Sequence, residues 1–173
     1  MKYTKYTFIF TLSLLFIACD GDDSTPESLT QNDIQGNWIL SELNTSKPVD
    51  LDNDGSANLN LTQETTCFDR MKVNFEDDTY QFTYPKINFT GENNQNLSCA
   101  DTLNTGTYIL ENNTLAATTT INNSTNTESV AVELANNQLK FTITSDQVNE
   151  YLNLDSADDE NSDLEFLEFI FEK

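Results

Sequence analysis

The stretch MKVNFEDDTYQFTY, Met71 to Tyr84, determines the fold class because its apolar residues recur at every second position. Side chains at alternate positions of a β-strand point to the same face of a sheet. The acidic segment Glu76–Thr79 separates the two alternating runs and is typical of a tight turn. The stretch therefore predicts an antiparallel hairpin whose apolar face is formed by Met71, Val73, Phe75, Tyr80, Phe82 and Tyr84.

The same alternation continues on both sides of this hairpin. Two further hairpins are predicted at residues 106–120 and 128–144, each with an Asn-Asn turn, because asparagine tolerates the positive φ that such turns require. Within the predicted strand NWILSEL, Trp38 and Leu43 are expected on opposite faces. The remaining predicted elements are the strands NWILSEL (37–43), KINFTG (86–91) and DLEFLEFIFEK (163–173), and short helical turns at 61–67 and 147–154.

These elements amount to eight or nine strands in meander order, without a long amphipathic helix. An open meander has two edge strands whose unpaired backbone groups favour aggregation, and closing the sheet into a barrel removes both edges. We therefore expect an all-β fold, an up-and-down antiparallel β-barrel of about eight strands with short helical turns. A β-sandwich is the second choice.

The segment IQGNWILSEL (34–43) resembles the Gly-x-Trp strand that opens lipocalins, with Gly36 and Trp38 at the motif positions. It is followed in order by ETTCFDRMKVNFEDDTYQFTY, GTYIL, NQLKFTI and FIFEK. This ordered set resembles the lipocalin-like domain of Bacteroidetes lipoproteins across nearly all of residues 33–173. The resemblance implies a lipocalin-like β-barrel in which Trp38 packs at the closed end. The later arginine that lipocalins often place against this tryptophan has no convincing counterpart in the sequence.

The stretch PVDLDNDGSANLNLTQE (48–64) carries aspartates at alternate positions. An EF-hand calcium loop needs oxygen ligands at positions 1, 3 and 5, glycine at 6, a carbonyl at 7 and a carboxylate at 12. Position 12 is Leu61, so Glu64 would complete the site if residues 61–64 formed a helical turn. A solvated turn shaped by aspartate and glycine is the alternative. The candidate calcium ligands are Asp50, Asp52, Asp54, Ser56, Asn58 and Glu64.

The amino-terminal sequence predicts an exported lipoprotein. An apolar run at residues 7–18 follows Lys2 and Lys5; it is shorter than the about 20 residues that span a bilayer, and an acidic segment follows it. The sequence FIAC resembles a lipobox, which implies removal of residues 1–18 and acylation of Cys19, for example with palmitate. Residues 19–32 are then a flexible acidic tether, similar to the export signal of Bacteroidetes surface lipoproteins. We expect an outer-membrane lipoprotein exposed at the cell surface; an ordinary secretory signal is the alternative.

Two cysteines remain after this segment, Cys67 and Cys99, with no Cys-x-x-Cys motif and no histidine that would indicate zinc. An exported protein matures in an oxidising compartment, where an even pair of cysteines forms a disulfide. The sequence therefore predicts a Cys67–Cys99 bridge, with two buried free thiols as the alternative.

The composition excludes several classes of function. A formal net charge of −21 opposes the phosphate backbone, so nucleic acid is not an expected partner. The chain has no histidine, which removes the commonest general base and the Ser-His and Cys-His nucleophile pairs. Its five glycines form no phosphate-binding loop. We do not expect an enzyme.

Two functions remain open. In the first, a calcium-braced barrel binds a small apolar molecule or a glycan. In the second, the aromatic residues fill the core, and the protein is a structural or protein-interaction module that presents Asn/Thr-rich hairpins to a partner. A cavity of about 300 Å³ or more would favour the first. The candidates to line it are Tyr80, Phe82, Tyr84, Tyr108 and Phe141.

Overall fold

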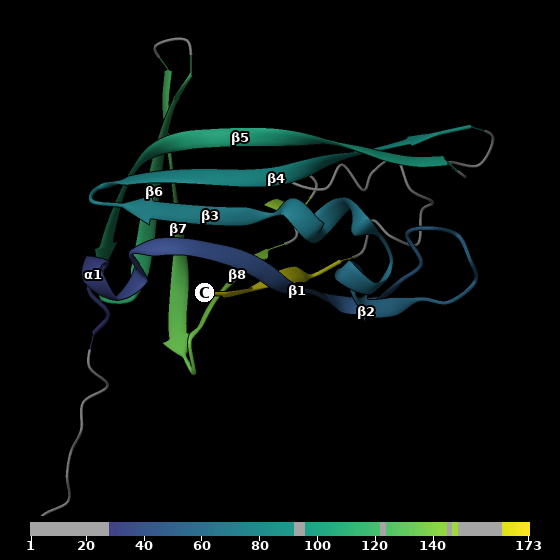
Figure 1. Cartoon of the computed structure of the whole chain (residues 1–173), viewed down its shortest axis with the longest axis horizontal. Coiled ribbons are helices and arrows are strands. Elements are labelled where there is room, and N and C mark those ends of the chain that lie inside the picture. The colour runs from purple at the N-terminus through teal and green to yellow at the C-terminus, as the bar shows by residue number, and fades with distance from the viewer. Residues whose placement is uncertain (1–27, 92–95, 122–123, 145–146, 149–163) are drawn as a thin grey trace, which may run out of the picture.

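The computed structural model describes residues 28–91, 96–121, 124–144, 147–148 and 164–173, which form an all-β barrel (Figure 1). Neighbouring strands are antiparallel, and β9 returns to pair with β1, so that β1 and β3–β9 close an eight-stranded barrel. The short β2 pairs with the far end of β1. The predicted up-and-down barrel is confirmed. The described strands are β1 (Gly36–Val49), β2 (Asn58–Asn60), β3 (Lys72–Glu76), β4 (Thr79–Thr90), β5 (Asn96–Glu111), β6 (Thr114–Ile121), β7 (Ser124–Ala135), β8 (Gln138–Thr144) and β9 (Phe166–Glu172).

Helices are short in the described part of the chain. The turn predicted at 61–67 is two 3-10 helices, η1 (Leu61–Gln63) and η2 (Thr66–Arg70), and the α-helix α1 (Gln31–Ile34) precedes β1. Of the turn predicted at 147–154, the first two residues are helical and the others lie outside the described residues. None of the helices described has the length and apolar character that a membrane span requires.

Asparagine and aspartate form the hairpin turns, as predicted. Asn112 and Asn113 have φ of 49° and 60°, and Asn136 and Asn137 have φ of 53° and 63°. Asp77 in the β3–β4 turn has φ of 51°. Asparagine and aspartate adopt this left-handed region more readily than other non-glycine residues, and paired positive φ values match the twist of the flanking strands.

The strand predicted separately at KINFTG is the second half of β4, which runs without a break through Pro85. Proline lacks the N–H that a central strand position donates, so it is tolerated within a strand only where that donor is not needed. In the structure, β3 pairs with β4 only as far as Thr83, and Pro85 lies beyond that point, opposite Asp101 of β5. Along this half of β4 one edge has no strand partner among the described residues, so a missing donor is tolerated.

The expected faces of β1 are wrong at Leu43. Trp38 and Leu43 are both buried in the core, although strict alternation places them on opposite faces. The register of β1 with β9 shifts between Leu40 and Glu42, so Ser41 is an extra residue, and its hydroxyl donates to the carbonyl of Ile170 at 3.0 Å. A bulge of this kind turns the strand by one position and returns its apolar residues to the interior.

Helix α1 closes one end of the barrel (Figure 1). The indole Nε1 of Trp38 donates to the carbonyl of Ile34 at 2.7 Å, and the ammonium of Lys173 lies 4.5 Å from the centroid of the Trp38 ring. A cation over the face of tryptophan is attracted by the ring electrons. The sequence offers no convincing arginine against this tryptophan, and in the structure Lys173 supplies a cation there.

Residues at the start of α1 and just before it are hydrogen-bonded to the β5–β6 hairpin. The backbone N–H of Leu29 donates to Asn113 Oδ1 at 2.7 Å, and Gln31 Nε2 donates to the carbonyl of Tyr108 at 3.2 Å. Hydrogen bonds from the hydroxyl and the backbone N–H of Thr30 lower the pKa of Asp33, so this carboxylate keeps its charge at the start of α1. Leu29 and Gln31 are thus attached to the barrel, and the domain boundary at residue 33 stays a prediction.

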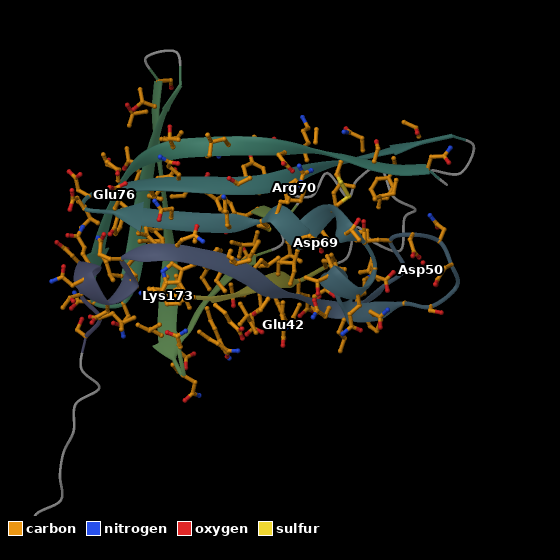
Figure 2. The ribbon with its side chains drawn as sticks, in the orientation of Figure 1. Glu42, Asp50, Asp69, Arg70, Glu76 and Lys173 are labelled. Carbon is orange, nitrogen blue, oxygen red and sulfur yellow. A yellow bond between two sulfur atoms is a disulfide. The ribbon has the colours of Figure 1, made fainter. Side chains whose placement is uncertain are left out.

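The disulfide predicted between Cys67 and Cys99 is present and fastens η2 to β5. Cys99 lies opposite Ile87 of β4, and Arg70 at the end of η2 forms an ion pair with Asp101 at 2.9 Å. Figure 2 shows Arg70 beside the β4–β5 hairpin. The helix η2 is thereby fixed to the β4–β5 hairpin.

We predict that replacing both Cys67 and Cys99 with alanine lowers the free energy of unfolding by about 3 to 4 kcal/mol, the loop-closure entropy for a bridge of this span. Urea unfolding monitored by the fluorescence of Trp38 measures the change. Reductant should destabilise the parent protein and leave the double variant unchanged. Equal stability of the oxidised parent and the variant would contradict the prediction.

Candidate functional site: a cavity in the barrel and an acidic loop

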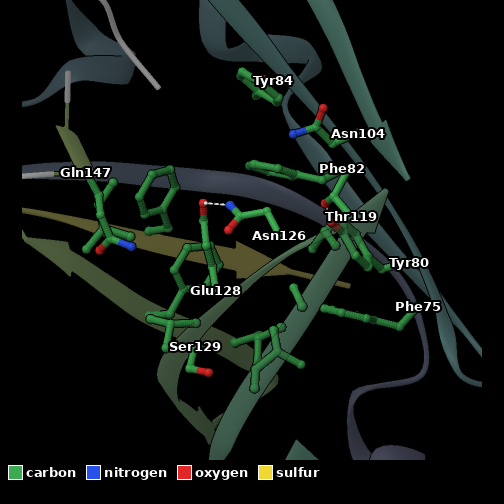
Figure 3. A pocket seen from close by; sticks show the side chains of 18 of the residues that line it. Phe75, Tyr80, Phe82, Tyr84, Asn104, Thr119, Asn126, Glu128, Ser129 and Gln147 are labelled. Carbon is green, nitrogen blue, oxygen red and sulfur yellow. Dashed lines mark hydrogen bonds between the residues drawn. The ribbon is translucent and has the colours of Figure 1, made fainter. Parts of the chain in front are cut away.

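The barrel encloses an open cavity of about 440 Å³ (Figure 3). Strands β3 to β9 line it with residues that point inward, and Gln147 adds to its wall. The cavity reaches from Phe75, near the end closed by α1, to Tyr84 and Asn104 farther along the barrel. This volume falls within the range of small-molecule sites in proteins.

Aromatic rings form much of the cavity wall. Phe82 and Tyr84 are stacked with their centroids 5.2 Å apart, and Phe141 stacks on Phe169 at 4.7 Å. Phe82, Tyr84 and Phe141 remain half-buried, since part of each ring faces the cavity rather than the core. Such rings offer large apolar faces to a ligand.

Polar groups gather at one side of the cavity. Asn126 Nδ2 donates to Glu128 Oε1 at 3.1 Å, and both residues come from β7. On β6, the hydroxyl of Thr119 lies 2.5 Å from that of Tyr80. A few polar groups on an otherwise apolar wall are what orients a ligand in a typical binding pocket.

Four of the five predicted lining residues, Tyr80, Phe82, Tyr84 and Phe141, lie in the wall of the cavity. Tyr108 instead packs in the closed end, where its ring meets Phe75 edge-on at 4.8 Å and its hydroxyl accepts a hydrogen bond from Gln35 at 2.7 Å. Burial, together with the charges of two aspartates in the β3–β4 turn, raises the pKa of the Tyr108 hydroxyl. Tyr108 is therefore part of the packed core at the closed end of the barrel and does not line the cavity.

Sequence reasoning missed Glu128 as a cavity residue. Glu128 has the same parity along β7 as Val130, Val132 and Leu134, which were predicted to face inward. That parity was the available signal, but a carboxylate at the start of an apolar strand reads as a solvated end residue.

The acidic loop between β1 and β2 lies at the other end of the molecule from the β3–β4 turn, as the labels Asp50 and Glu76 in Figure 2 show. One carboxylate oxygen from each of Asp50, Asp52 and Glu64 lies within 4.8 Å of the others, a group that could hold a metal ion. Glu64 follows η1, so the helical turn on which its participation depended is present.

Glu64 is the buried member of this group, with 5% of its surface exposed. Its Oε2 accepts the backbone N–H of Leu51 at 2.9 Å, and its Oε1 accepts from the side-chain amide of Asn58. Buried carboxylates are stable only when such donors or a cation compensate for lost hydration. These two hydrogen bonds hold the Glu64 carboxylate beside the loop.

The other predicted ligands take different positions. Asp54 accepts a hydrogen bond from the backbone N–H of Ser56 at 2.7 Å, and its own N–H donates to Asp50 and Asp52, each at 3.1 Å. The Asp54 carboxylate therefore shapes the turn and stands outside the group of three. Asn58 is engaged with Glu64, so the structure brings together three of the six predicted ligands.

A family model for a lipocalin-like domain matches residues 34–141, which is more than half of the chain. The matched span runs from the end of α1 into β8 and includes most of the cavity wall. No curated protein and no solved structure matches the chain.

Proposed function

Because the chain belongs to the lipocalin-like domain family, we propose that its barrel binds a small molecule and that it does so on a lipid-anchored protein at the cell surface. The observation that carries the proposal is the cavity of about 440 Å³ with half-buried aromatic rings in its wall. A barrel filled by its own side chains, as a purely structural or interaction module requires, would have no such space. The role is binding rather than catalysis.

The wall supports a small apolar molecule more strongly than a glycan. Val73, Leu115 and Leu139 add aliphatic surface to the aromatic rings. A sugar carries hydroxyl groups around its whole edge, and these would lose hydration against aliphatic side chains without gaining hydrogen bonds. An apolar ligand gains from burial against the same surface.

We predict that the neutral apolar dye N-phenyl-1-naphthylamine binds the full chain and that Ala117→Trp weakens this binding about tenfold or more, because an indole at Ala117 fills the cavity. Ala116→Trp is the matched control, since Ala116 is the neighbouring residue of β6 and does not line the cavity. Dye fluorescence measures both affinities. Equal dye binding by both variants would place the dye elsewhere and contradict the proposal.

The acidic loop supports a calcium brace as a second part of the proposed function. Asp50, Asp52 and Glu64 would supply oxygen ligands, the chemistry that calcium prefers. Three carboxylates held this close repel one another, and a divalent cation reverses the sign of that interaction. The ion would tie the β1–β2 loop to the segment after η1 and stabilise the fold.

Calcium at ten times its dissociation constant should stabilise the protein by about 1.4 kcal/mol and raise Tm by about 3 to 5 °C. Asp52→Asn should remove this response, because it deletes a charge from the group of three but leaves an oxygen to accept the N–H of Asp54. Asp54→Asn should keep the response. Thermal melts with calcium and with chelator measure the difference, and identical behaviour of the two variants would count against the brace.

The anchor rests on the sequence, since Cys19 lies outside the described residues. Acylated Cys19 would hold the acidic protein at the outer membrane, with the predicted acidic tether, residues 19–32, before the barrel. We predict that the mature protein carries acyl chains on Cys19 by mass spectrometry, and that Cys19→Ser releases the protein from membrane fractions. Digestion by protease added to intact cells tests surface exposure. An unmodified amino terminus would refute the anchor.

A further inference from the structure

Among the described residues that line the cavity, Glu128 is the charged one, and no lysine or arginine is present. From this arrangement we propose that the ligand is an amphipathic organic cation, an apolar body that carries an ammonium or similar head group. The inference rests on the proposed binding function and specifies its ligand class.

Glu128 is placed to meet such a head group. It is half-buried on β7 and lies opposite Ala117 of β6, whose methyl side chain leaves space above the neighbouring strand. The hydrogen bond from Asn126 orients the carboxylate, and Figure 3 shows the Asn126 side chain pointing to Glu128, with Phe82 and Tyr84 above them in the view. A carboxylate oriented in this way adds directional attraction for a donor cation.

The aromatic rings supply the second element of cation recognition. The stacked pair Phe82–Tyr84 and the pair Phe141–Phe169 belong to the same wall as Glu128. An ammonium over an aromatic face is attracted by the ring electrons, and the attraction grows as water is excluded. The rings would thus contact both the apolar body of the ligand and its charged head.

The charge of the whole chain favours the same ligand class. A formal net charge of −21 raises the local concentration of cations and lowers that of anions. A fatty acid would bring its carboxylate to a wall that offers Glu128 and no basic partner among the described residues.

The test uses three probes of similar shape: phenyltrimethylammonium, its neutral isostere tert-butylbenzene and the anion benzenesulfonate. Calorimetric titration of the full chain should give an affinity for the cation about tenfold higher than for the neutral isostere, with the anion weakest. Glu128→Gln should remove most of this preference. Glu133→Gln is the matched control, because Glu133 is an exposed glutamate of the same strand outside the cavity and its loss changes the net charge equally.

The outcomes separate the two proposals. A cation preference that Glu128→Gln abolishes and Glu133→Gln preserves supports the inference. Binding of the cation and the neutral isostere with equal affinity overturns the inference and leaves the proposed binding function in place, as does a preference that both variants reduce equally. Absence of binding by every probe, with no binding of the neutral dye, overturns both.

Discussion

The pairing of β9 with β1 is the interaction on which the rest of the structure depends. It joins β9 to β1 and closes the sheet into a barrel, so that neither strand is left as an open edge along this pairing. The same pairing carries Phe169 and Phe171 into the interior, where both are buried, and sets Lys173 over the ring of Trp38. Because of the bulge at Ser41, β1 buries Trp38 near one end of the barrel and Leu43 farther along the same strand. Without this closure the cavity would be one face of an open sheet.

Closure also explains why the interior is filled at one end and open farther along. Near α1 the large rings of Trp38 and Tyr108 are fully buried, and the hydrogen bond from Trp38 to Ile34 holds α1 against this closed end. Tyr80 fits beside this end because its partner on β5 is Gly106, where an added Cβ would lie 3.0 Å from the Tyr80 ring. Farther along, the small side chain of Ala117 faces the cavity, and the rings across from it cannot fill the space.

Period-2 alternation and Asn-rich turns predicted the fold class, the strand order and the hairpins, because both signals are local. The errors fall where a longer-range interaction decides. The bulge in β1 depends on its register with β9, and Pro85 is tolerated because β3 ends before it. The sequence could not place Tyr108 at the closed end, because that position depends on its contacts with Gln35 and Phe75. Alternation along β7 predicted which face points inward. It could not predict that Glu128 on that face lines a cavity, because the cavity depends on the strands across the barrel.

The two proposed sites use the acidity of the chain in physically separate ways. The acidic loop lies between β1 and β2, with Glu64 directly after η1, and none of Asp50, Asp52 and Glu64 lines the cavity. A cation at the loop would therefore act on the stability of the β1–β2 end, through the buried Glu64 that both Leu51 and Asn58 hold in place. A cation in the cavity would act on selectivity, through Glu128 and the rings around it. The cavity wall is built by β3 to β9, whereas the acidic loop joins β1 to β2, so the two proposed sites share no residue.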